Sequence, residues 1–234
     1  MQTEHTLKQY DTELESVRAK VLQMGGLVEQ QIVDALQALI HADFNLAEQV
    51  IENDHRVNAL EVSVDEDCSH IIARRQPAAG DLRMIMMVVK TVTDLERIGD
   101  EAAKIARIAQ KTCQSDRMYS PRFNEIKTMV SLVCEMLRTS LDAFARLDVS
   151  RTIEVARQDE LVDEHFRAAM RQLITFMLED PRTISMSLDV LWVAKAIERI
   201  GDHSKNIAEY VVYMVKGKDV RHTSVQEMER EALQ

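Results

Sequence analysis

Two pairs of carboxylates stand out in this sequence because they occur in the same five-residue motif. Glu-Arg-Ile-Gly-Asp runs from Glu96 to Asp100 and returns 102 positions later, from Glu198 to Asp202. Residues four apart lie on the same face of an α-helix, so the two carboxylates of each motif are expected side by side. Adjacent carboxylates repel each other, share a proton or share a cation. We expect each pair to bind a metal cation.

Further acidic side chains complete two expected metal sites. One predicted helix carries oxygen-bearing side chains along a single edge, at spacings of four, three and four: Asp54, Asn58, Glu61 and Asp65. Carboxylates suit Mg, Mn or Fe ions, whereas tight Zn sites usually draw on His and Cys. The expected ligands of a divalent or trivalent ion (Mg, Mn, Fe or Zn) are Glu96, Asp100, Asp54 and Glu61 in the first set, and Glu198, Asp202, Asp159 and Asp163 in the second.

A purely structural interpretation of these carboxylates stays open, in which they pair with Arg97, Arg199 and other basic neighbours on a helix surface. Their placement favours a site, because Glu96 and Asp100 lie outside a separate strip of alternating charge. We expect that strip to be a solvated face with salt-bridged neighbours; it consists of Lys90, Asp94, Arg97, Glu101 and Lys104.

For two other residues near the second motif we expect structural roles and not a role as metal or cofactor ligands. His203 follows Asp202 directly, and one helical step turns it about 100° away from that carboxylate, so we expect a surface histidine. Trp192 is the only tryptophan and takes the position of Lys90 in the repeat. We expect it to pack between bundles or against a partner.

Composition and periodicity predict an all-α protein built from six long helices. The 234 residues include only six Gly and three Pro, and apolar residues recur at spacings of three and four. Gly25 and Gly26 interrupt the first helical pattern, which indicates a bend or a close helix contact. The expected helices span about 7–39, 45–75, 82–113, 121–148, 150–178 and 181–216, with Asn45, Asp81 and Ser120 as expected N-caps and Gly217 as a stop.

The order helix, helix, motif helix occurs twice, which predicts two similar three-helix bundles related by internal duplication. We place the first bundle at residues 1–115, the second at 119–217 and a charged tail, helical or disordered, at 218–234. The two acidic edges differ, because Phe166 stands where the first half has Glu61. We therefore do not expect equal metal occupancy of the two sites.

Charge and cysteine usage narrow the class of protein. The formal net charge of −10 argues against nonspecific binding to nucleic acid or to an anionic membrane surface. Three cysteines without metal-type spacing indicate reduced, buried thiols. The polar start, Met1–Tyr10, has no signal-peptide apolar region, and the longest apolar run, Met84–Val89, is too short to cross a bilayer. We expect a cytoplasmic protein.

Known catalytic motifs do not occur in the sequence. It has no glycine-rich phosphate loop, no nucleophile elbow and no His-Glu-x-x-His zinc motif. We therefore favour a regulatory adaptor over an enzyme. A carboxylate-metal enzyme or metal-storage protein of the helical-bundle type is the alternative, and an inert helical scaffold is a third.

Both motifs and several other segments carry a family resemblance. Segments Glu13–Arg18, Met24–Gln31, Ile71–Pro77, Leu141–Arg146 and Tyr213–Gly217, together with the two motifs, resemble the PhoU family, accessory proteins of the phosphate-specific transport system. The resemblance covers nearly the whole chain.

The resemblance implies a negative regulator of the phosphate regulon and a modulator of phosphate uptake. It implies two three-helix bundles, a cytoplasmic homodimer, and metal bound by Glu96 with Asp100 and by Glu198 with Asp202. The implied partners are the importer ATPase subunit PstB and the sensor histidine kinase PhoR, with membrane contact only through them. A bound cation would supply the positive charge that an anion or a phosphorylated partner needs.

Overall fold

The computed structural model describes residues 2–113, 124–221 and 223–233, and all its regular elements in that part are helical. The all-α fold predicted from the sequence is confirmed. The elements are α1 (Gln2–His41), α2 (Phe44–Arg75), α3 (Ala79–Cys113), α4 (Asn124–Arg146), the short 3-10 turn η1 (Val149–Arg151), α5 (Thr152–Glu179), the 3-10 turn η2 (Pro181–Thr183), α6 (Ile184–Lys216) and α7 (Val225–Leu233).

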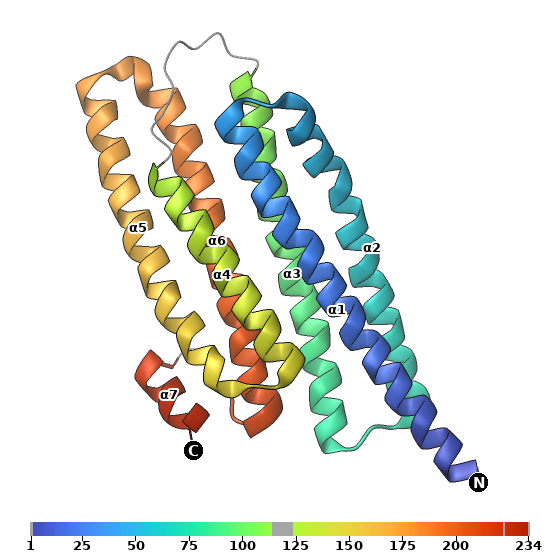
Figure 1. Cartoon of the computed structure of the whole chain (residues 1–234). Helices are drawn as coiled ribbons and strands as arrows, with labels where there is room; N and C mark the ends of the chain where they lie inside the picture. Colours follow the sequence, from blue (N-terminus) through green and yellow to red (C-terminus); the bar gives the residue numbers. More distant parts are fainter. Residues whose placement is uncertain (1, 114–123, 222, 234) are drawn as a thin grey trace.

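Six long helices form two antiparallel three-helix bundles that lie side by side (Figure 1). The first bundle consists of α1, α2 and α3, and the second of α4, α5 and α6. The bundles meet where α3 packs along α6 and α1 touches α4. Both motif helices therefore lie at the centre of the molecule. Each also faces the second helix of its own bundle, α2 or α5.

One hydrophobic core runs through both bundles. The middle of the apolar stripe of α1 is fully buried, with Val21, Met24, Val28 and Ile32 at 0 % exposure. The same cluster of buried side chains includes residues from all six long helices. Packing of these stripes, rather than helix propensity alone, stabilises helices in folded proteins. The proposed domain limits stay a prediction, because the expected boundary and the expected cap at Ser120 lie at or beyond the edge of the described residues.

The internal duplication is visible in the turns. Asp43 and Asp148 stand 105 positions apart and have nearly the same backbone angles, φ −91 and ψ 99 against φ −94 and ψ 99. Each N–H donates to the carbonyl five residues before it, at 3.0 Å in both halves. The preceding residue, Ala42 or Leu147, has a positive φ in both halves. Equivalent turns therefore set equivalent helix pairs in the two bundles.

Gly25 marks a close contact between the bundles. Helix α1 continues through it without a break. A Cβ atom at this position would lie 2.4 Å from Cδ1 of Leu141 on α4. Of the two explanations that the sequence left open, the close helix contact is therefore the one found here.

Several expected helix ends shift by a few residues. Asp43, not Asn45, caps α2, because its Oδ1 accepts from the Leu46 N–H at 3.0 Å. Helix α3 begins at Ala79, so Asp81 lies in its first turn instead of capping it. Gly217 ends α6 as expected, with a left-handed φ of 72° that suits glycine. Part of the tail forms α7, which packs on the start of α5.

None of the helices in the described residues is long and apolar enough to cross a membrane.

Candidate metal centre

The packing of α2 against α3 brings the four predicted carboxylates of the first set into one electrostatic neighbourhood. Loss of hydration, and then the charges of Asp100, Glu61 and Asp54, raise the pKa of Glu96. Burial and the charge of Asp100 likewise raise the pKa values of Asp54 and Glu61. Such mutual effects require short separations, because charge interactions in proteins are screened with distance. The four carboxylates therefore lie near one another on two packed helices.

The negative charge of this first set, which we call the acidic site, is only partly offset by Arg107 and Arg97, whose charges lower the pKa values of Asp54 and Glu96. Within residues 2–113, 124–221 and 223–233, none of its four carboxylates forms an ion pair with a lysine, arginine or histidine. Gln31 on α1 donates to Oδ1 of Asp54 at 3.4 Å. Its own Oε1 is buried without a partner, as is Oδ1 of the neighbouring Asp65. Buried oxygens without donors are costly, so the acidic site is electrostatically suited to a cation.

Gly99 allows polar groups from three helices to meet at the acidic site. A Cβ atom on Gly99 would lie 3.1 Å from Oδ1 of Asp54 and 3.2 Å from Oε1 of Gln31. The equivalent Gly201 is surrounded instead by apolar carbons of Val133, Val162 and Met136, at 3.5 Å or more. The two glycines therefore occupy a polar and an apolar environment respectively.

The second predicted set already contains its own cations. Lys195 donates to Oε1 of Glu198 at 2.6 Å, and Lys205 donates to Oδ2 of Asp159 at 2.7 Å. Asp163 pairs with Arg167 at 2.8 Å. These side chains neutralise three of the four carboxylates, so a metal ion there would have to displace bound ammonium or guanidinium groups.

Asp202 is the second-set carboxylate without such a partner. Asp202 is exposed at the surface, yet partial loss of hydration among its neighbours, followed by the charges of Glu198 and Asp159, raises the pKa of its carboxyl group to about 6.

Two replacements between the repeats explain the difference. Lys195 stands where the first half has Thr93, and Phe166 stands where it has Glu61. The Lys195 ammonium lies 5.5 Å from the centre of the Phe166 ring, within the range of a cation–π contact. An acid and a hydroxyl in the first half thus become an aromatic ring and a lysine in the second.

No three His, Cys, Asp or Glu side chains converge as metal ligands in the part of the chain that the structure describes. The carboxylates of the acidic site are neighbours, and their oxygens would have to turn toward a common point to coordinate an ion. The donor type and the excess negative charge fit a hard cation. The metal-binding role of all eight residues stays a prediction.

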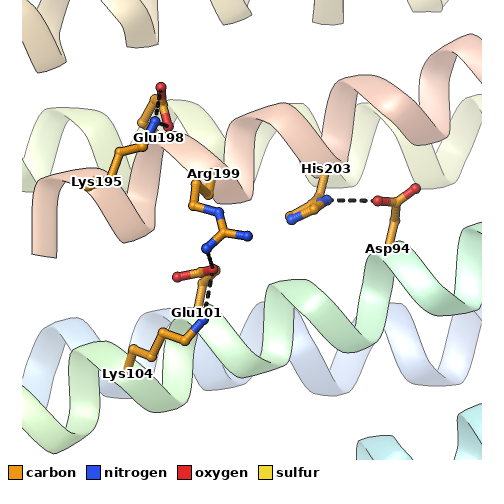
Figure 2. A network of polar contacts seen from close by, with 7 residues as sticks. All are labelled: Asp94, Glu101, Lys104, Lys195, Glu198, Arg199 and His203. Atoms are coloured by element: carbon orange, nitrogen blue, oxygen red, sulfur yellow. Dashed lines mark hydrogen bonds and ion pairs between the residues drawn. The ribbon is translucent and has the colours of Figure 1, made fainter. Parts of the chain in front are cut away.

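Sequence reasoning missed a buried polar network between the two bundles. Asp94 on α3 is only 2 % exposed and accepts three hydrogen bonds from α6. These come from Nδ1 of His203 at 2.7 Å, Nδ2 of Asn206 at 3.2 Å and the hydroxyl of Tyr210 at 2.8 Å. Figure 2 shows Asp94 and His203 facing each other across the interface. His203 is itself 8 % exposed, and its Nε2 is buried with no hydrogen-bond partner among the residues that the structure describes.

Glu101 forms a second buried contact in the same interface. It is 3 % exposed and lies between Lys104 on its own helix, at 3.0 Å, and Arg199 of α6, at 2.7 Å (Figure 2). The prediction of a surface His203 is therefore wrong, and the prediction of a solvated charged strip is wrong for Asp94 and Glu101, which are buried. Arg97 and Lys104 of the same strip are exposed and pair with Asp94 and Glu101 along α3. The two buried carboxylates also contact partners on α6. The strip has the three- and four-residue spacing of a helix face that packs against another helix. Because its side chains are charged, the sequence indicated a solvent-exposed face instead.

The expectation of buried cysteines holds for two of the three. Cys68 and Cys134 are buried, and Cys113 is partly exposed. Burial raises the pKa of Cys68 to about 12 and that of Cys134 to about 11, which leaves almost no thiolate near neutral pH.

Comparison with known proteins gives matches in both bundles. The family model described as "PhoU domain" matches residues 21–109 and 126–211. The chain is 50 % identical over 230 residues to the phosphate-specific transport system accessory protein PhoU homolog of Pseudomonas aeruginosa, covering 98 % of this chain and 94 % of that protein. It is 44 % identical over 226 residues to the accessory protein PhoU of Escherichia coli K12, covering 97 % and 93 %.

Solved structures agree with these matches. The crystal structure of PhoU from Pseudomonas aeruginosa superposes with a TM-score of 0.85 at 50 % identity, covering 89 % of this chain and 100 % of that one. The phosphate transport system regulatory protein PhoU from Streptococcus pneumoniae gives a TM-score of 0.83 at 29 % identity, covering 90 % and 99 %. The duplicated motif, the paired bundles and these relatives together show that the chain belongs to the PhoU family.

Proposed function

We propose that this protein is an accessory regulator of phosphate uptake that acts on the phosphate-specific transport system as an adaptor and not as an enzyme. The observation that carries the proposal is the match to PhoU along both bundles, with relatives named as accessory proteins of that system. As an adaptor, it would restrain the phosphate regulon by linking the importer ATPase subunit PstB to the sensor histidine kinase PhoR. We include a homodimer and a cytoplasmic location in the proposal.

The acidic site is the proposed metal centre of this adaptor. Asp54, Glu61, Glu96 and Asp100 would hold the ion, with the Oε1 of Gln31 beside them. Ionising these neighbouring carboxylates together is unfavourable, as the raised pKa values of three of them indicate. A bound cation would remove that penalty and fix the spacing of α2 and α3. It would also supply positive charge to an otherwise acidic surface, which an anionic or phosphorylated partner could recognise.

The second set is proposed as a weaker metal site. Lys195, Lys205 and Arg167 already occupy three of its carboxylates. At this site the bundle is held together by protein cations, so its structure should depend less on metal. We therefore propose unequal binding, with the first half responsible for most of the metal content.

Elemental analysis of the purified protein tests the metal proposal. The variant Glu96→Gln with Asp100→Asn should lose most bound metal, because it removes two ligands while preserving side-chain size. The matched variant Glu198→Gln with Asp202→Asn should lose little. Equal metal content in all three proteins would contradict the proposal, and loading far beyond a few ions per chain would favour a storage protein.

Regulation is tested separately in cells. A strain that lacks the endogenous protein is complemented with each variant, and a phosphate-starvation reporter is measured in phosphate-rich medium. The wild type should keep the reporter silent, and pull-downs should recover the importer ATPase and the sensor kinase. A reporter that stays active with the wild type, or a pull-down that recovers neither partner, would contradict the adaptor role.

A further inference from the structure

The groove between α3 and α6 is rich in basic side chains, although the protein as a whole is acidic. It has a volume of about 600 Å³, within the range of small-molecule sites. Five basic side chains line it: Lys104, Arg107, Lys111, Lys195 and Arg199. Two acidic side chains, Glu101 and Asp189, lie among them, and Glu198 beside the groove pairs with Lys195. Five cations against three carboxylates leave an excess of two positive charges in a chain of net charge −10. A positive groove in a negative protein selects anions locally.

Buried carboxylates hold some of these cations in place. Glu101, at 3 % exposure, fixes both Lys104 and Arg199 through contacts of 3.0 and 2.7 Å. Asp189 fixes Lys111 at 2.6 Å. Arg107, by contrast, forms no ion pair or hydrogen bond with its side chain in the described part of the chain. Cations that are positioned before a ligand arrives lose less entropy on binding, and the unpaired Arg107 has free donors for an anion.

Trp192 adds an aromatic surface to the same groove. It is the only tryptophan in the chain, and it is 65 % exposed. It was expected to pack between the bundles or against a partner, and here it lines the groove with most of its surface in contact with solvent. An exposed indole beside Lys and Arg is the kind of surface on which nucleobases stack.

The spacing along the groove separates the aromatic surface from the cations. Helices α3 and α6 run antiparallel, since Glu101 meets Arg199 and Lys111 meets Asp189. Along α6, Trp192, Lys195 and Arg199 follow steps of three and four and so share one face. With a rise of 1.5 Å per residue, Lys195 and Arg199 lie about 4.5 and about 10 Å from Trp192 along the axis. An aromatic ring at Trp192 and an anionic chain extending toward Arg199 would fill this length.

We propose that the α3–α6 groove binds a nucleoside polyphosphate. The base stacks on Trp192, and the phosphates extend along α6 toward Arg199, with Lys104 and Arg107 on the opposite wall, which α3 forms. Inorganic phosphate would use the cations but leave the indole without a role, and the 600 Å³ volume would remain largely empty. This site is distinct from the acidic site and does not depend on metal. Because the groove spans the interface between the bundles, an occupied groove would hold α3 against α6.

Tryptophan fluorescence provides a direct assay, because Trp192 is the sole indole. The full-length protein in EDTA is titrated with ATP and GTP, and in parallel with tripolyphosphate, adenosine, inorganic phosphate and a phosphotyrosine peptide. Excitation at the red edge of tryptophan absorption avoids the nucleotides. The nucleotides should quench the emission in a saturable manner and bind at least about tenfold more tightly than adenosine or phosphate.

Variants locate the binding. Lys104→Ala with Arg107→Ala should weaken ATP binding by about tenfold or more in calorimetry, and Trp192→Leu should weaken ATP but not tripolyphosphate. The control, Arg56→Ala with Arg171→Ala, removes two exposed cations outside the groove and should bind as the wild type does. The single variant Lys104→Ala leaves Arg107 in place, so a loss of affinity in this variant cannot arise from a change in charge that Arg107 makes near the acidic site. Circular dichroism checks that each variant is folded.

Four outcomes would overturn the proposal. These are no binding of either nucleotide, equal binding of tripolyphosphate and ATP, unchanged affinity in the groove variants, and tighter binding of the phosphopeptide than of the nucleotides. Binding that is retained in Glu96→Gln with Asp100→Asn separates this site from the proposed metal centre, so either proposal can fail without the other.

Discussion

Replacing Asp94 by alanine should uncouple the two bundles. This carboxylate is 2 % exposed and accepts hydrogen bonds from His203, Asn206 and Tyr210 on the opposite bundle. The substitution removes the common acceptor and leaves three donors without it. His203 is the most deeply buried of the three and has the least access to replacement water.

The expected cost follows from these contacts. Breaking a buried hydrogen-bonded charge network by removing one partner costs about 3–5 kcal/mol. Asn206 and Tyr210 are only partly buried, so water can compensate them in part, which favours the lower half of that range. For a cost of about 3–4 kcal/mol in a chain of this size, the fall in melting temperature is roughly 6–16 °C. The total stability of a folded protein is only about 5–15 kcal/mol, so the effect should be large.

Urea denaturation followed by circular dichroism measures this cost. Asp11→Ala removes an exposed aspartate on α1 and is the matched control, which should change stability by less than about 0.5 kcal/mol. Tyr210→Phe removes one donor to Asp94 and should cost about 1 kcal/mol. If the loss of Asp94 separates the bundles before they unfold, the single transition should divide into two or its m-value should fall.

A double-mutant cycle tests whether the contacts are responsible. The costs of Asp94→Ala and Tyr210→Phe should not add, because both remove the same hydrogen bond. Full additivity, or a cost for Asp94→Ala below about 1 kcal/mol, would refute the view that this network holds the bundles together.

Two further predictions concern the motifs. Gly201→Ala should raise the melting temperature by roughly 2–4 °C, since alanine gains about 1 kcal/mol in a helix and its Cβ would have ordinary contacts of 3.5 Å or more. Gly99→Ala should raise the melting temperature less than Gly201→Ala does and should lower the metal content, because the new Cβ would crowd Asp54 and Gln31. Equal stabilisation by the two substitutions, with unchanged metal content, would contradict this. The pKa of Asp202 is raised from 3.8 to about 6 in the folded protein, so ionisation of this carboxyl group disfavours the folded state. The stability that the protonated group contributes is fully present below about pH 4 and is lost as the pH rises through 6. Metal-free Asp202→Asn should therefore be more stable than the wild type at pH 7 but not at pH 4 in thermal melts, and a difference of equal size at both pH values would contradict the pKa shift.

Residue spacing along the chain is enough to predict the six long helices and the shared helix face of Glu96 and Asp100. The three- and four-residue spacing of apolar side chains predicts all six long helices, because a helix repeats every 3.6 residues. The four-residue spacing of Glu96 and Asp100 places both on the same face of α3 for the same reason. Helix ends were less accurate, since neighbouring polar residues such as Asp43 and Asn45 compete to cap the same turn.

The charged strip on α3 shows what a single helix cannot reveal. Asp94 and Glu101 have the types and spacing of a solvated face, and both are buried. Their partners His203, Asn206 and Arg199 lie about a hundred positions further along the chain. Whether such a carboxylate contacts water or a partner depends on which helices pack together, and no local pattern contains that information.

The amino-acid sequence by itself determined the helical class, the internal duplication, the family and the carboxylates of the acidic site, because each is written in short-range spacing or in residue identity. Only the tertiary structure decided that Lys195 and Lys205 neutralise the second set, that Asp94 joins the bundles and that basic residues from α3 and α6 surround Trp192. The physical reason is that charge and burial act between side chains through space. A carboxylate's role is set by the neighbours that folding gives it, whatever their distance along the chain.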